Sequence, residues 1–391
     1  MKNGLFCINI HNRVKIMTYH EIKAKSLLRT YKKIDSWFIS KYGMNLYRGC
    51  QHDCIYCDGR HEKYQVDGVF GKEIAVKINA INLLKKETNL QRRQKFYNNG
   101  FIMVGGGVGD SYQPAEESYQ LTRKTLQHLA CLRLPVHLLT KSTLIERDID
   151  LLQQINENAK AVISFSFSST SDEISQFFEP GVPLPSKRLQ TIKNLKKQGF
   201  HCGMFLLPVI PFITDTAEIM KQSIEDANKA GIDFIIFGGM TLKKGRQKEF
   251  FYDVLKQNYP DLLPSYESIY TKNKWGNASE EYYQSINQTY ESIMKQYPIP
   301  KRIPSTIFND VVNTTDKVLI MLEHIDYLLK LQNRRSPYGY AAYNISRLKQ
   351  DITTMKNNLQ QIKGVGKVTE KIILEILETG TSTYYKKLLI K

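Results

Sequence analysis

The stretch from Asn45 to Tyr64 reads NLYRGCQHDCIYCDGRHEKY. Its cysteines, Cys50, Cys54 and Cys57, follow the spacing C-x3-C-x2-C, which is short enough for one loop to place three thiolates around a cluster of soft metal ions. A fourth thiolate is missing from this run, so a 4Fe-4S cluster held here would keep one iron open. An open metal position predicts chemistry rather than a purely structural role.

The residues around the thiols fit a cluster. Tyr56 places an aromatic ring beside the last cysteine, and Arg48 and Arg60 offset negative charge. Two alternatives remain open from the residues alone. The loop could hold a structural zinc, with His52 or His61 as the fourth ligand, or its cysteines could belong to a disulfide framework.

Composition sets the wider limits. The 391 residues contain 55 Lys plus Arg against 38 Asp plus Glu, a formal net charge of +17, which favours a polyanionic partner such as nucleic acid. A lysine-rich codon usage would produce the same excess. The six cysteines do not form the dense pattern of a disulfide scaffold, no apolar run reaches the length of a membrane span, and no signal-peptide core is present. We expect a cytoplasmic protein without a membrane partner.

Apolar runs before and after the loop predict strands separated by helices. Residues 1–40 are expected to form a helical preface, in which residues 19–31 pack as a helix on the outside of the protein, and residues 37–39 are expected to form the first strand. Five further runs lie at residues 101–104, 136–140, 161–167, 202–210 and 234–237. Strands that alternate with helices predict parallel βαβ units with right-handed crossovers, and six of them predict a partial barrel over residues 41–255.

The cysteine spacing, with an aromatic residue before the last cysteine, resembles the signature of the radical S-adenosylmethionine (SAM) enzymes, and NLYRGCQHDCIYCDGR is similar to the branch that contains the spore photoproduct lyases. The resemblance covers roughly residues 20–255. It implies an α/β fold, a partial (β/α)6 TIM-like barrel with a C-terminal α-helical extension. It also implies a 4Fe-4S cluster and SAM as cofactors, an electron donor such as flavodoxin or ferredoxin, and cleavage of SAM to a 5′-deoxyadenosyl radical.

The resemblance also implies where SAM would bind. The turn after the second strand carries Gly105, Gly106, Gly107 and Asp110, whose backbone groups could approach the methionine amine and carboxylate closely, although the same glycines would suit a tight turn. Lys141, at the end of the third strand, matches a lysine that reaches the SAM carboxylate in this branch, but it could also be a solvated cap. Ser164 and Ser166 alternate toward one face of the fourth strand, where the ribose is the family's usual partner.

Residues 256–350 change character and have helical spacing. This extension interleaves cations with aromatic residues, which could hold phosphates and stack bases or could form an ordinary solvated face. The residues are Arg302, Arg334, Arg335, Tyr338, Tyr340 and Tyr343.

Residues 351–391 resemble the helix-hairpin-helix module of DNA-repair proteins. A helix near residue 359, the hairpin with Gly364 and Gly366, and a second helix would present backbone N–H groups and a positive helix end to a phosphate, with Lys367 adding charge. Glu370 stands where that module usually has a small residue. Such hairpins also occur as packing elements.

Together these features and resemblances predict a SAM-cleaving, lyase-like radical enzyme that binds DNA and abstracts hydrogen from nucleic acid, in DNA repair. Photoproduct lyases return hydrogen from a cysteine just before the second-strand turn, and this chain has none there, so direct reversal of the photoproduct would need Cys202 or a tyrosine instead. One alternative is a radical SAM enzyme that modifies RNA or protein. The other is a non-enzymatic nucleic-acid-binding protein with a structural zinc.

Overall fold

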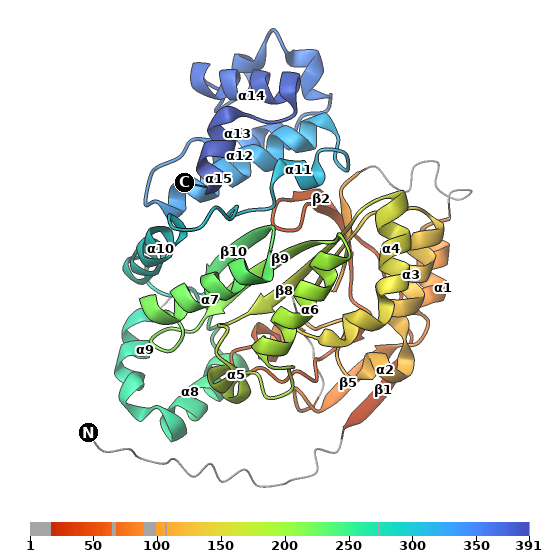
Figure 1. Ribbon diagram of the computed structural model, residues 1–391, viewed down its shortest axis with the longest axis vertical. Coiled ribbons are helices and arrows are strands. Elements are labelled where there is room, and N and C mark those ends of the chain that lie inside the picture. The colour runs from red at the N-terminus through yellow and green to blue at the C-terminus, as the bar shows by residue number, and fades with distance from the viewer. Residues whose placement is uncertain (1–16, 65–67, 90–98, 106–107, 272–273, 391) are drawn as a thin grey trace.

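The computed structural model describes residues 17–64, 68–89, 99–105, 108–271 and 274–390 (Figure 1). Its main sheet has seven strands in the order β10-β9-β8-β7-β6-β3-β2. All neighbours pair in parallel except β2, which runs antiparallel to β3 at the edge. The strands are β2 (Arg29–Asp35), β3 (Ser40–Met44), β6 (Phe101–Val104), β7 (Val136–Thr140), β8 (Ala161–Phe167), β9 (His201–Val209) and β10 (Phe234–Gly239).

Helices cover the outer face of this curved sheet (Figure 1). The arrangement is the partial (β/α)6 barrel that the sequence predicts. The helices up to residue 269 are α1 (Ala80–Glu87), α2 (Ala115–Tyr119), α3 (Leu121–Cys131), α4 (Ile149–Asn158), α5 (Asp172–Phe178), α6 (Pro185–Lys197), α7 (Ala217–Ala230), α8 (Arg246–Asn258) and α9 (Leu263–Ile269).

The predicted strands from residue 101 onward are confirmed to within two residues at each end. Their runs are apolar because both faces are covered, as parallel strands of a barrel require. The first strand is wrong by three residues: residues 37–39 form a turn, Ile39 has a φ of 50°, and β3 begins at Ser40. The apolar residue Trp37 does not belong to a strand. Its ring instead packs against the Arg302 guanidinium.

The helix expected at residues 19–31 is also wrong. This segment forms β1 (Thr18–Ile22) and the start of β2. Strand β1 pairs with β5 (Glu73–Lys77), which also pairs with β4 (Tyr47–Arg48), and the three make a second small sheet that frames the entry to the cysteine loop. The partners that satisfy the backbone of these strands lie far along the chain, so tertiary pairing overrides a weak local helical pattern.

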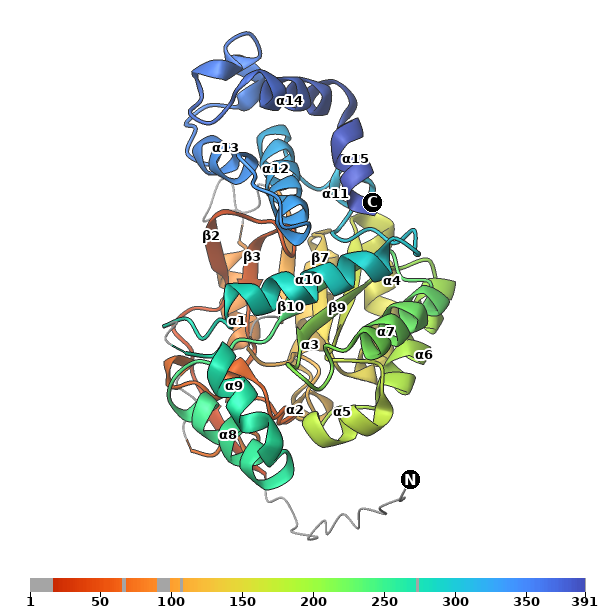
Figure 2. The ribbon, with the colours of Figure 1, turned by 90° about the vertical axis from the view of Figure 1, so that its left-hand side faces the viewer.

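The last helices form a lobe at the amino ends of the barrel strands (Figures 1 and 2). The backbone N–H groups of Gly100 and Ile235, near the starts of β6 and β10, donate to the carbonyls of Val311 and Pro300 at 2.9 and 2.8 Å. The lobe consists of α11 (Ser305–Phe308), α12 (Thr314–Leu331), α13 (Tyr338–Ile345), α14 (Lys367–Thr379) and α15 (Thr383–Ile390), and α10 (Glu280–Met294) precedes it in the chain. Helix α10 crosses the β10 edge of the barrel in Figure 2, where the ring of Tyr290 stacks on Phe237 at 4.2 Å.

Two of the residues proposed to contact nucleic acid are buried in this lobe. The guanidinium of Arg302 lies 4.0 and 3.6 Å from the ring centroids of Trp37 and Tyr327, and only 2% of the residue is exposed. Tyr338 is likewise buried. Both predictions are wrong because Arg302 joins α12 to the barrel and Tyr338 packs beside Tyr384 of α15, whereas Tyr340 and Tyr343 remain exposed. Within the described residues, none of the helices combines the length and the apolarity needed to cross a membrane.

Candidate functional site

The cysteine loop lies at the carboxyl end of β3, where barrel enzymes carry their chemistry. Cys50 and Cys54 are buried and Cys57 is half-buried. Burial raises the pKa of all three thiols, and at Cys50 the charge of Asp110 and the two other cysteines raise the pKa further. Thiols in such a place become thiolates when a positively charged metal centre compensates their charge.

Arg60 fixes the shape of the loop. Its guanidinium donates to the Cys54 carbonyl at 3.1 Å and to the Asp53 side chain at 2.7 Å, and it lies over the rings of Phe70 and Phe250. Arg60 thus holds the backbone at the second cysteine, Cys54, and at the residue before it, in addition to any effect of its charge.

The three thiols fit a cluster better than a single ion. Among the described residues, no three His, Cys, Asp or Glu side chains converge closely enough to hold one metal ion. In a 4Fe-4S cluster each thiolate binds a different iron, so three thiols on one loop need not converge on a point. Cys50, Cys54 and Cys57 are therefore the residues that would hold the cluster, and His52 and His61 complete no zinc site.

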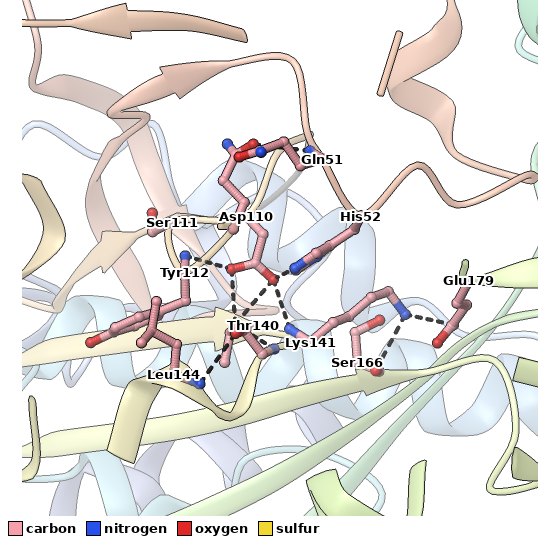
Figure 3. Close-up of polar contacts among 12 residues, drawn as sticks. Gln51, His52, Asp110, Ser111, Tyr112, Thr140, Lys141, Leu144, Ser166 and Glu179 are labelled. Carbon is pink, nitrogen blue, oxygen red and sulfur yellow. Dashed lines mark hydrogen bonds and ion pairs between the residues drawn. The ribbon is translucent and has the colours of Figure 1, made fainter. Parts of the chain in front are cut away.

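A buried carboxylate organises the side of the site next to Tyr56, and Figure 3 shows its contact with Lys141. Glu179, just after α5, accepts hydrogen bonds from the Tyr56 hydroxyl, from Lys141 Nζ at 2.9 Å and from Arg188 at 2.6 Å. Burial alone would raise the pKa of Glu179, but the charges of Arg188 and Lys141 outweigh it and hold the pKa well below its usual range. Lys141 is thus an ordered cation at the barrel mouth rather than a solvated cap.

Asp110 ties the turn after β6 to the end of β7 (Figure 3). Its carboxylate accepts from the Thr140 hydroxyl at 2.8 Å and from the backbone N–H groups of Lys141 and Tyr112 at 2.7 and 2.8 Å, and it lies 3.4 Å from His52 Nδ1. These bonds occupy the carboxylate, which gives Asp110 a positioning role in the turn that we proposed for SAM.

The glycine turn itself is partly described. Gly105 has a φ of +72°, and a Cβ built there would lie 2.5 Å from the Ser111 hydroxyl, so this position requires glycine. Gly106 and Gly107 lie outside the described residues. Gly109 comes close to the cysteine loop, because a Cβ on it would lie 3.5 Å from the Gly49 carbonyl oxygen.

The two serines of β8 differ in depth. Ser164 is fully buried and its hydroxyl lies 2.8 Å from His137 Nε2. The His137 ring also packs against the rings of Phe38 and Phe205. Ser166, nearer the carboxyl end, is half-buried and donates to the Leu207 carbonyl at 3.0 Å. Of the two, Ser166 lies closer to the carboxyl ends of the strands.

A cavity of about 410 Å³ opens beside the loop and the glycine turn. It is lined by the carboxyl ends of β3 and β6 and by the N-terminal strands, including Arg29 and Tyr31 of β2. Sequence reasoning missed these residues because it placed the segment on the outside as a helix. The available signal was period-two alternation, since Arg29 and Tyr31 line the cavity whereas Thr30 and Lys32 do not.

The C-terminal hairpin lies in the lobe, at the opposite end of the barrel from the cysteine loop (Figure 1). Gly364 has a φ of +86° and Gly366 is the N-cap of α14, whose first residue, Lys367, is exposed. The expected first helix is wrong, because residues Leu359–Gln361 form only a 3-10 turn. Gly366 is open, with nothing within 4 Å of a Cβ built on it.

Comparisons with known proteins identify a family, relatives by sequence and a shared fold. The family model described as Radical SAM superfamily matches residues 44–222. An uncharacterised protein of Methanocaldococcus jannaschii is 30% identical over 250 residues, which cover 64% of this chain and 87% of that protein. An uncharacterised protein of Mycobacterium tuberculosis is 28% identical over 263 residues, which cover 66% and 75% of the two chains.

Among solved structures, spore photoproduct lyase complexed with dinucleoside spore photoproduct superimposes with a TM-score of 0.53 at 16% sequence identity. The match covers 72% of this chain and 79% of the lyase. At that identity the likeness shows a shared fold.

Proposed function

Because this chain belongs to the radical SAM superfamily, we propose that it is an enzyme that abstracts hydrogen from a nucleic acid, in DNA repair. Family membership makes it an enzyme with a 4Fe-4S cluster and SAM as cofactors. When bound, these groups supply one-electron cleavage of the SAM sulfonium to a 5′-deoxyadenosyl radical. A reductant such as flavodoxin or ferredoxin is the proposed electron donor. Membership of this superfamily also argues against the alternative prediction of a non-enzymatic nucleic-acid-binding protein with a structural zinc.

The observation that carries the proposal is the shared cavity. It joins the cysteine loop and the Gly105 turn to a wall of cationic and aromatic side chains, which is the combination that binds a nucleotide.

Each site residue has a proposed role. Cys50, Cys54 and Cys57 would hold the cluster, Lys141 and the Gly105 turn would orient the methionine end of SAM, and Ser166 would face its ribose.

The source of a returning hydrogen atom differs from that proposed for photoproduct lyases. No cysteine lines the described cavity. Cys202 is fully buried near the start of β9, the wrong end of the strand, and burial raises its pKa to about 12. A tyrosine of the cavity is the remaining candidate, so the substrate need not be the spore photoproduct.

Mass spectrometry tests the proposed substrate. Anaerobically reduced holoenzyme is incubated with SAM and with irradiated or alkylated DNA uniformly deuterated in its nucleosides. We expect deuterium to enter 5′-deoxyadenosine and the damaged nucleoside to change mass. Transfer of deuterium only from labelled RNA or protein would replace DNA by those substrates, and SAM cleavage without transfer from any of them would contradict the proposal.

A further inference from the structure

One wall of the barrel-mouth cavity is made by cations. Arg29 of β2, Arg48 of β4 and Lys77 of β5 all line it. Burial lowers the pKa of Lys77, and the nearby charge of Arg48 on the same wall lowers it further. Like charges gathered at a cavity destabilise the empty site, so the wall favours an anionic ligand.

No carboxylate of the described residues neutralises Arg29 or Lys77 of this wall. Lys77 Nζ donates to the Asn45 carbonyl at 2.5 Å, and the Arg29 guanidinium lies 5.3 Å from the centroid of the Tyr31 ring. The carboxylate that does line the cavity, Asp35, accepts backbone N–H groups of the following turn, and burial raises its pKa.

Aromatic side chains line the same cavity. Tyr31, Phe38 and Tyr64 are among its walls, and Gly105 brings the proposed SAM turn to its edge. Aromatic rings stack on nucleobases whatever their sequence, and cations bind the phosphates between them. A carboxylate alone, such as that of SAM, would need neither the aromatic residues nor three cations.

We propose that Arg29, Arg48 and Lys77 bind the backbone phosphate beside the nucleotide on which the enzyme acts. The substrate is then a polynucleotide whose target nucleotide enters the barrel mouth as a single strand or flipped out of a duplex. This inference rests on the proposed function and deepens it, because it gives the substrate a binding site at the same end of the barrel as the cysteine loop.

Strand β2 offers a matched pair of variants for the test. Arg29→Gln removes a cation that lines the cavity, and Lys32→Gln removes an exposed cation from the opposite face of the same strand. Both parent side chains are exposed, so neither change opens a cavity in the core. Lys77→Gln is the second cavity variant. Binding of a fluorescent six-nucleotide single strand to anaerobic holoenzyme is measured by anisotropy over a series of salt concentrations.

We expect Arg29→Gln and Lys77→Gln each to weaken oligonucleotide binding about tenfold and to make the slope of log affinity against log salt shallower by about 0.7, the value for one lost phosphate contact on a single strand. Lys32→Gln should change the affinity less than twofold. The affinity for SAM, measured by calorimetry, should not change in any of the three variants. A loss of SAM affinity with unchanged oligonucleotide binding would assign the wall to the SAM carboxylate and overturn the proposal.

Binding of inorganic tripolyphosphate tests the anion site independently of any nucleic acid, so it distinguishes an error in this inference from an error in the proposed function. It should raise the Tm of the parent holoenzyme and of Lys32→Gln, but not that of the Arg29→Gln/Lys77→Gln double variant. No shift in the parent would overturn the anion site even if nucleic acid binds elsewhere. A shift in the parent without any binding of oligonucleotide would overturn the polynucleotide as substrate, and with it the proposed function.

Discussion

At the scale of single residues, Glu179 holds two cations in place at the carboxyl ends of the barrel strands. It is fully buried, and it is the carboxylate partner of both Lys141 and Arg188. Removing one partner of a buried ion pair leaves uncompensated charge, which typically destabilises a protein by about 3–5 kcal/mol.

Glu179→Gln should therefore lower the free energy of unfolding by about 3 kcal/mol and weaken SAM binding, because Lys141 loses its anchor. Chemical denaturation of the anaerobic protein and SAM calorimetry measure the two effects. Glu173→Gln, an exposed carboxylate on the neighbouring α5, is the control and should change neither. Equal unfolding free energies for both variants would show that Glu179 is not a positioning residue.

The cysteines give a second prediction at this scale. Cys54→Ala should abolish the brown absorbance at about 400 nm and SAM cleavage, because two thiolates do not retain the cluster. Cys131→Ala, which changes an exposed thiol at the end of α3, should keep both. Full iron content in Cys54→Ala would contradict the assignment of the loop.

At the scale of elements, the predictable parts of the fold are those with a local cause. Strands β6 to β10 are covered on both faces, so their apolar runs identify them, and the cysteine spacing identifies the loop without knowledge of its surroundings. The exposed N-terminal strands β1 and β2 carry charged residues among few apolar ones and depend on pairing with β5 and β3. Glu179 and the cationic wall likewise come together only through topology, since 123 positions separate Tyr56 from Glu179.

His137 of β7 contacts the turn before β3 and strand β8, and its burial predicts that the free energy of unfolding depends on pH. Its ring on β7 lies 3.0 Å from the Phe38 carbonyl and 2.8 Å from the Ser164 hydroxyl of β8. Burial lowers its pKa from 6.5 to about 4. Between these values the unfolded chain binds more protons than the folded protein. The stabilisation is therefore complete above pH 6.5 and decreases as the pH falls toward 4, by about 3 kcal/mol in all.

His137→Gln should make the decline in unfolding free energy from pH 6.5 to 4 shallower by up to about 1.4 kcal/mol per pH unit. Ser164→Ala keeps the ring but removes its hydroxyl partner, and it should keep the parent slope. Urea unfolding at half-unit pH intervals measures the slopes, and an unchanged slope in His137→Gln would mean that this ring is not the titrating group.

At the scale of the whole molecule, the C-terminal lobe and the cysteine loop occupy opposite ends of the barrel (Figure 1). A nucleic acid on the hairpin would therefore be tethered to the protein rather than delivered directly to the cofactors. The lobe also supports the barrel: His324 of α12 lies 2.8 Å from the Ser36 carbonyl and 3.0 Å from the Tyr385 hydroxyl of α15.

Because α15 is built into this lobe, deletion of residues 355–391 cannot test the hairpin alone. It would remove the buried side chains of Tyr385 and Leu389 and the hydrogen bond, 3.0 Å long, from the Lys301 N–H to the Leu389 carbonyl. Loss of a buried tyrosine alone destabilises a protein by about 3–5 kcal/mol, by analogy with other large aromatic side chains. We expect the truncated protein to have a lower Tm as well as weaker DNA binding, so its binding defect would have no single cause.

Gly366→Ala isolates the hairpin instead. The position has a φ of −94°, which alanine adopts readily, and its Cβ would touch no protein atom. The methyl group would therefore stand where a phosphate approaches the N-terminus of α14, and the fold should lose only about 1 kcal/mol for the poorer N-cap. Duplex DNA should bind several-fold more weakly with a shallower salt slope, while SAM cleavage without substrate stays as in the parent.

Gly364→Ala is the contrasting variant. Its Cβ would lie 2.7 Å from the Tyr340 ring at a φ of +86°, so this change should disturb the hairpin and lower the Tm as well. If Gly366→Ala binds duplex DNA as the parent does at every salt concentration, the hairpin is a packing element and the barrel-mouth wall must carry the nucleic acid alone.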